Sequence, residues 1–96
     1  MFIHAVLFEI KPKEVRDYRL DSKMWAREAR KHGGFIAYFT MQRISFKNQY
    51  VSVYEWKSER AHKRFMGEFH ELLVAKSKAK VKVLGYYNLK RIDEVS

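Results

Sequence analysis

Four stretches of the chain are rich in apolar residues and predict β-strands. Their β-branched and aromatic side chains suit a pleated sheet surface. The stretches are residues 2–10, 35–45, 50–56 and 81–90. Successive side chains of a strand alternate between its faces, so Val51 and Val53 share one face. Tyr54 and Trp56 then share the other. Both faces of the sheet are therefore expected to be apolar.

Two further stretches carry apolar residues at intervals of three and four, which predicts amphipathic helices. The first opens at Pro12, which tolerates the first turn of a helix, and stops at Gly33-Gly34. The second covers residues 58–76, and Ser58 is a favourable N-cap residue. Each helix can bury only one side against the sheet.

The order β-α-β-β-α-β predicts one α+β domain over residues 1–96 with the ferredoxin-like arrangement. In this fold a four-stranded antiparallel sheet carries both helices on one face. The short turn at residues 46–49 makes the second and third strands a hairpin. The other face stays uncovered, although it is as apolar as the first. We therefore expect a homodimer whose open sheet faces pack together.

Composition limits the kinds of bond, cellular location and partner to be expected for the protein. The chain has no cysteine, which excludes disulfides and thiolate metal sites. Its apolar runs fall short of the ~20 residues that span a bilayer, and residues 1–10 have no basic leader, so we expect a cytoplasmic protein without a membrane partner. The net charge of +9 is spread along the chain, which is typical of solvated faces.

The segment around the third strand and second helix resembles a known family. The run from Tyr54 to Glu59, with Ala61, Phe65 and His70 behind it, is similar to the antibiotic-biosynthesis-monooxygenase-like family. The resemblance implies a dimeric α+β barrel with a pocket in each protomer, between the sheet and its two helices. Some members of this family oxidise polycyclic aromatics with O2 and without metal or flavin. Others open haem.

The haem-degrading members resemble this chain in outline but not in their functional residues. They use an Asn in the first strand and a Trp and a His in the second helix. Matching the turn from Trp56 to Ser58 places these positions at Ala5, Phe65 and Ala75. None has the required side chain, so haem degradation is disfavoured and no cofactor is expected.

His70 is the candidate catalytic residue, as the base or orienter of an acidic phenol, because histidine titrates near neutrality. The structural alternative is a partly exposed helix residue. Quinone-forming members of the family use Trp, Asn and Tyr side chains around a phenolic substrate. The candidates by residue type for binding a small aromatic molecule are Trp25, Tyr38, Trp56, Phe65, Tyr86 and Asn88. Core packing is the alternative for the two tryptophans.

The other histidines have structural interpretations. His4, among apolar strand residues, is expected to be a buried, hydrogen-bonded residue at the dimer face. His62 and His70 are eight residues apart, about 12 Å along a helix, which is too far to share one metal ion. His32 is expected to be a cation at the end of the first helix. No metal site is predicted.

Two other functions fit the same element order. A non-catalytic small-molecule-binding or stress-response barrel cannot be separated from an enzyme on these residues. An RNA-recognition motif would place Tyr50, Tyr54 and Trp56 on an exposed sheet. However, Asn48-Gln49-Tyr50 replaces the Lys/Arg-Gly-aromatic start of that motif, so nucleic acid is not the expected ligand.

Overall fold

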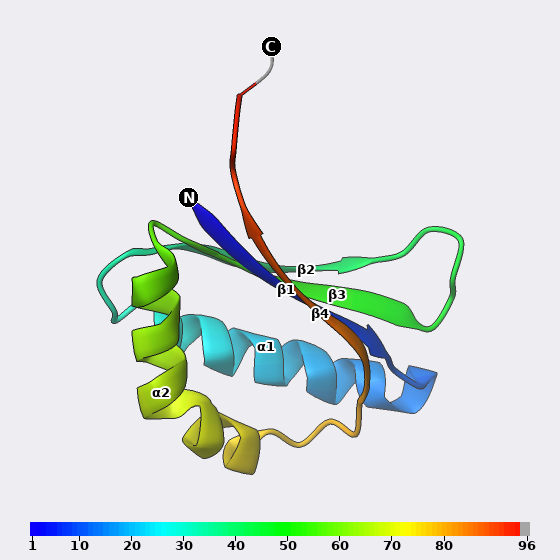
Figure 1. The fold of residues 1–96 in the computed structure, drawn as a ribbon. Coiled ribbons are helices and arrows are strands. Elements are labelled where there is room, and N and C mark those ends of the chain that lie inside the picture. The colour runs from blue at the N-terminus through cyan, green and yellow to red at the C-terminus, as the bar shows by residue number, and fades with distance from the viewer. Residues whose placement is uncertain (95–96) are drawn as a thin grey trace.

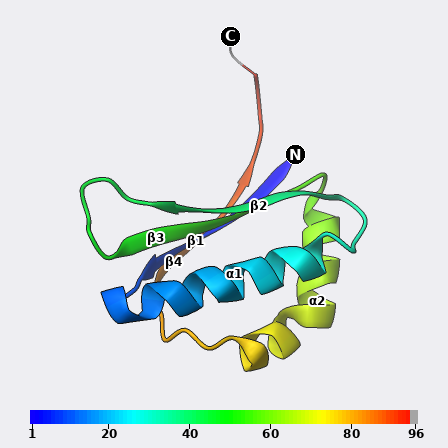
Figure 2. The same ribbon diagram turned by 180° about the vertical axis from the view of Figure 1, so that it is seen from behind.

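The computed structural model describes residues 1–94, in which two α-helices cover one face of a four-stranded antiparallel sheet (Figure 1). Seen from behind, both helices still lie on the same side of the sheet, with α2 standing across one end of α1 (Figure 2). The elements are β1 (Phe2–Glu9), a 3-10 turn η1 (Pro12–Glu14), α1 (Val15–Ala29), β2 (Phe35–Gln42), β3 (Gln49–Trp56), α2 (Glu59–Lys76) and β4 (Lys82–Lys90). This confirms the predicted ferredoxin-like fold.

The strand order β2-β3-β1-β4 places β1 in the interior of the sheet. Its register pairs Leu7 with Gly85 but Phe8 with Val83, so Leu84 is an extra residue in β4. Glycine within a strand often marks such a β-bulge, as Gly85 does here. It brings Val83 and Tyr86 to the same face of the sheet, the face toward the helices.

The helix boundaries follow local chemistry. The Ser58 hydroxyl accepts a hydrogen bond from the backbone N–H of Ala61 at 3.2 Å, so the predicted N-cap of α2 is confirmed. Pro12 opens a 3-10 turn, and the α-helix begins three residues later at Val15. Gly34 has φ +88°, and its carbonyl accepts a hydrogen bond from Lys57 N–H at 2.7 Å. These contacts join the start of β2 to the start of α2.

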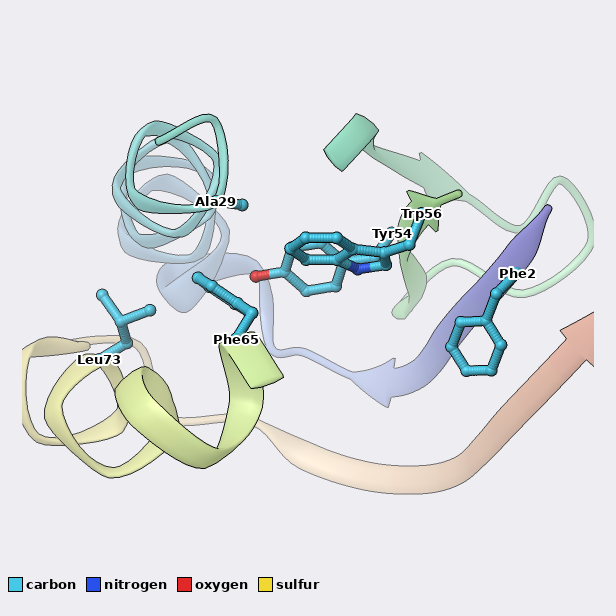
Figure 3. Close-up of a cluster of buried hydrophobic side chains, with 6 residues drawn as sticks. All are labelled: Phe2, Ala29, Tyr54, Trp56, Phe65 and Leu73. Atoms are coloured by element: carbon cyan, nitrogen blue, oxygen red, sulfur yellow. The ribbon is translucent and has the colours of Figure 1, made fainter. Parts of the chain in front are cut away.

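The core lies between β3, β1 and the two helices. Its cluster of buried residues is Phe2, Ala29, Tyr54, Trp56, Phe65 and Leu73 (Figure 3). Trp56 and Phe65 are fully buried, with ring centroids 5.3 Å apart. The ring of Tyr54 packs against Phe65 at 5.8 Å.

The sheet face away from the helices is apolar, as predicted. Cross-strand pairing places Phe39, Val53, Ala5 and Tyr87 in one row across it. Val53 in the middle of the row is only 6% exposed, whereas Phe39 and Tyr87 near its ends are 37% and 49% exposed. This face carries no covering element among the described residues.

The third-strand aromatics lie on the opposite, helix-covered face. Tyr54 and Trp56 are 4% and 0% exposed, and the ring of Tyr50 lies 5.9 Å from that of Tyr18 on α1. They are therefore not the exposed platform that an RNA-recognition motif requires, and that argument for the RNA alternative is wrong.

Candidate functional site

A cavity of about 430 Å³ opens between the helix-covered face of the sheet and the two helices. The helices pack chiefly on β1, β2 and β3, so space is left beside β4. Its apolar lining residues are Val6, Phe8, Trp25, Met66, Val74, Ala79, Val81 and Val83. Its polar and tyrosine lining residues are His4, Tyr18, Asp21, Ser22, Tyr38, Ser52, Tyr54, His70, Ser77 and Tyr86.

The segment that follows α2 forms one wall of the cavity and is held by carboxylates of α1 and the turn before it. Asp21 Oδ2 accepts hydrogen bonds from the backbone N–H groups of Lys78, at 2.9 Å, and Ala79, at 2.8 Å. Glu14 Oε1 accepts one from Lys80 N–H at 2.8 Å. These hydrogen bonds hold the segment after α2 in place as a wall of the cavity.

Hydroxyl groups give the cavity a neutral polar side. Tyr18 OH and Ser52 Oγ are 2.6 Å apart, and Ser22 Oγ donates to the carbonyl of Tyr18 at 2.8 Å. Burial raises the pKa of Tyr18 to about 12, against a smaller opposing effect of the Ser52 hydrogen bond. Burial also raises the pKa of Tyr38. Both phenols are therefore uncharged at neutral pH.

Tyr54 brings a buried hydroxyl group without a hydrogen-bond partner to the cavity wall, within the described part of the chain. Its side chain is 4% exposed, its OH has no hydrogen-bond partner among the described residues, and burial raises its pKa. Its ring lies edge-on to that of Tyr38, with centroids 4.4 Å apart. A buried donor without a partner is costly, so a ligand or water that accepts from it would be stabilised.

His4 is buried in the cavity wall, at 8% exposure. Its Nδ1 lies 2.7 Å from Oδ1 of Asn88, the residue opposite it on β4. The prediction that His4 is buried and hydrogen-bonded is confirmed. Its predicted place at the dimer face is wrong, because it shares the helix-covered face of β1 with Phe2.

His62 lies behind His4, with ring centroids 4.5 Å apart. It is 7% exposed, and its Nδ1 has no partner among the described residues. Burial, reinforced by the proximity of His4, lowers the pKa of His62 to about 4. This imidazole is neutral at physiological pH. Within residues 1–94, no group of three or more His, Asp or Glu side chains is placed to hold a metal ion.

His70 occupies the solvent side of the cavity. It is exposed, and its ring meets the ring of Trp25 edge-on at a centroid distance of 5.9 Å. Trp25 is fixed in turn, since its Nε1–H donates to Ser77 Oγ at 2.9 Å. Ser77 Oγ donates to the carbonyl of Leu73 at 2.8 Å.

The structure separates the predicted site residues into two groups. Trp25, Tyr38, His70 and Tyr86 line the cavity. Trp56 and Phe65 do not, and their predicted place in the pocket wall is corrected to the core. Trp56 of β3 and Phe65 of α2 pack against each other where α2 crosses the sheet, and no space remains between them.

The polar lining residues that were not predicted from the sequence include His4, Tyr18 and Ser52. A signal was present for two of them. His4 is two residues from both Phe2 and Val6, and Ser52 is two residues from Tyr54. Residues two apart in a strand point to the same face, so His4 and Ser52 each share a face with those neighbours. Nothing in that alternation tells which face meets the helices.

A second hollow, of about 350 Å³, adjoins the cavity at Val81, which lines both. Its charged lining residues are Glu9, Lys11, Lys13, Glu14, Lys80 and Lys82. Part of the net positive charge is therefore gathered at this end of the molecule.

None of the described helices is long and apolar enough to cross a membrane.

No protein-family model and no curated protein matches the chain, but solved structures do. SnoaB, a cofactor-independent oxygenase from Streptomyces nogalater, matches with a TM-score of 0.81 at 13% identity, covering 98% of this chain and 95% of that one. A candidate antibiotic biosynthesis monooxygenase from Deinococcus radiodurans has a TM-score of 0.79 at 13% identity, covering 100% and 97%. The chain has the fold of antibiotic-biosynthesis-monooxygenase-like proteins.

Rv0793 from Mycobacterium tuberculosis shares that fold with this chain, at a TM-score of 0.73, 18% identity and coverage of 99% and 98%. The resemblance inferred from the segment Tyr54 to His70 is thus confirmed at the level of the fold.

Proposed function

We propose that the cavity binds a small aromatic molecule and that the protein oxidises it with O2 and without a cofactor. The observation that carries this proposal is a cavity of about 430 Å³ whose walls combine aromatic rings with uncharged hydroxyl groups. Such walls suit a planar phenolic ligand, because rings supply apolar contact and neutral hydroxyls fix its oxygen atoms. The similarity in fold to a cofactor-independent oxygenase supports the proposal.

The proposed reaction needs an electron-rich substrate. Loss of a phenolic proton makes an adjacent ring system able to react directly with O2. For a substrate CH2 group that becomes a carbonyl, one oxygen atom stays on carbon and the other leaves as water, so the substrate supplies all the electrons. The protein then has to bind, orient and hold protons.

In this proposal His70 contacts the ligand at the solvent side, as base or orienter, while Trp25, Tyr38 and Tyr86 form walls. The edge-on contact of Trp25 with His70 supports a shared role at the opening. Tyr54 OH offers a hydrogen bond to a ligand oxygen, which would relieve its unpaired state.

Oxygen uptake tests the proposal. We would screen polycyclic phenols with an oxygen electrode in the presence of a chelator, and compare the wild type with His70→Ala. The control is Lys63→Ala, an exposed residue of the same helix whose side chain is 73% accessible. We expect a loss of turnover only in His70→Ala. Unchanged turnover in that variant would overturn the role of His70.

A non-catalytic binding barrel is the second candidate. It is favoured by the exposure of His70, whose contact with the cavity wall is a ring contact with Trp25. It predicts saturable quenching of Trp25 fluorescence by a phenol such as 1-naphthol without any oxygen uptake. Oxygen uptake that follows the binding curve would reject this candidate.

We also propose that residues 1–96 act as one cytoplasmic domain that forms a homodimer through the open sheet face. Leu89 on that face is 53% exposed, and Leu20 on α1 is exposed to the same extent. Burial of an apolar sheet face should survive high salt, because its driving force is not ionic. Light scattering should give twice the mass of one chain, and Leu89→Asp should yield monomers while Leu20→Asp should not. A monomeric wild type would contradict the dimer.

A further inference from the structure

We propose that His4, oriented by Asn88, accepts the proton of a phenolic ligand held in the cavity. This inference rests on the proposed function, since it presumes that the cavity binds an aromatic molecule. It assigns proton transfer to the buried wall of the cavity and leaves His70 to orient the ligand at its solvent side.

The hydrogen bond between the two side chains defines which nitrogen of His4 is free. Oδ1 of a carboxamide can only accept, so His4 Nδ1 carries the hydrogen in the 2.7 Å contact with Asn88. Nε2 then has an unshared electron pair. A histidine with one ring nitrogen fixed as donor and the other free is the arrangement that a general base needs.

The groups around His4 give it no ionic partner within the described part of the chain. His62 of α2 stacks near it and is itself neutral, while the rings of Tyr54 on β3 and Tyr86 on β4 lie 6.5 and 6.4 Å from it. Asp21, the carboxylate among the described lining residues, is already bonded to Lys78 and Ala79. No carboxylate among the described lining residues is therefore paired with His4.

Proton transfer from a phenol to His4 places two opposite charges side by side in the cavity wall. The phenolic O–H bond breaks and an N–H bond forms at His4 Nε2, with no transfer of electrons and no further reactant. The imidazolium keeps its Nδ1–H bond to Asn88, which strengthens when the donor is charged. In a buried wall the attraction between these charges is weakly screened, so it offsets part of the cost of forming them there.

His70 lacks these features. It is exposed, and no hydrogen bond fixes either ring nitrogen within the described part of the chain. Its tautomer is therefore free to change, whereas that of His4 is set by Asn88. This difference assigns the two histidines different roles.

The test uses 4-nitrophenol, because its phenolate absorbs visible light and its phenol does not. At a pH where the free probe is mostly protonated, we expect the wild type to raise the ionised fraction of bound probe. His4→Gln should lower the ratio of ionised to neutral bound probe by about tenfold, one pKa unit, with little change in affinity. Asn88→Leu should lower it partly, and His70→Ala should weaken binding but leave the ratio unchanged.

The outcomes separate this inference from the function on which it rests. If the wild type binds no 4-nitrophenol, both are overturned. Binding with the same ionised ratio in wild type and His4→Gln overturns the role of His4 alone. Nitrogen-15 NMR of the unliganded wild type adds a test that needs no variant to fold. We expect His4 as the Nδ1–H tautomer, and an Nε2–H tautomer would reject the assignment.

Discussion

Tyr18 on α1 and Ser52 on β3 are joined by a hydroxyl-to-hydroxyl hydrogen bond of 2.6 Å at the inner wall of the cavity. Both side chains are buried, so each supplies the partner that the other would otherwise lack. The bond links the first helix to the middle of the sheet. It therefore contributes to the stability of the fold and also fixes the shape of the cavity wall.

Tyr18→Phe should destabilise the protein by about 1–2 kcal/mol, because Ser52 Oγ is left buried without its partner. Ser52→Ala should cost a similar amount. The double variant should cost less than the sum, since no unpaired hydroxyl remains. Urea unfolding measures all three. Lys63→Ala, at an exposed residue of α2, is the control, and strictly additive effects would contradict the coupling.

Gly34→Ala should destabilise the fold by about 1–3 kcal/mol, through its φ of +88° and a Cβ that would lie 2.7 Å from the Cβ of Ala61. Gly33→Ala is the matched control, because a Cβ there meets no atom within 4 Å. Thermal unfolding followed by circular dichroism compares the two. Equal melting temperatures would show that the space between Gly34 and Ala61 can accommodate a methyl group without loss of stability.

Gly67→Ala should stabilise α2 by about 1 kcal/mol, the difference in helix propensity. An added Cβ at Gly67 would meet no atom within 4 Å, so the glycine serves no close packing among the described residues. For a protein of this size the melting temperature should rise by roughly 4–8 °C. At Gly85 an added Cβ would lie 2.7 Å from Tyr87 OH, so Gly85→Ala should give no such gain.

Stability should fall as the pH drops from about 6.5 toward 4. The folded pKa of His62 is about 4, below the value of 6.5 for an unperturbed histidine, so the unfolded chain binds the proton first. The contribution is complete above pH 6.5 and is lost on acidification through that window. Between pH 7.5 and 5 we expect a loss of about 1–2 kcal/mol in the free energy of unfolding.

His62→Phe removes this titration and should flatten the pH dependence of the urea midpoint over the same window. His70→Ala serves as the control, because His70 is exposed, and should keep the slope of the wild type. An unaltered slope in His62→Phe would assign the acid sensitivity to other groups.

Local chemistry explains why so much of the fold could be predicted. The cap at Ser58, the positive-φ turn at Gly34 and the bulge beside Gly85 each depend on the conformational preferences of one or two residues. The predicted stop of the first helix at Gly33-Gly34 was less accurate, since α1 already ends at Ala29. The two-residue alternation of β3 likewise places Tyr54 and Trp56 on one face from the chain alone.

Alternation does not say which face the helices cover, and this is why the site was predicted only in part. His4 shares its face with Phe2, but its position in the cavity follows from where α2 crosses β1 and β3. That crossing also buries Trp56 and Phe65, which are of the same residue types as the cavity walls. Strand order and helix placement depend on contacts between residues far apart in the chain, so they decide which aromatic residues fill the core and which line the cavity.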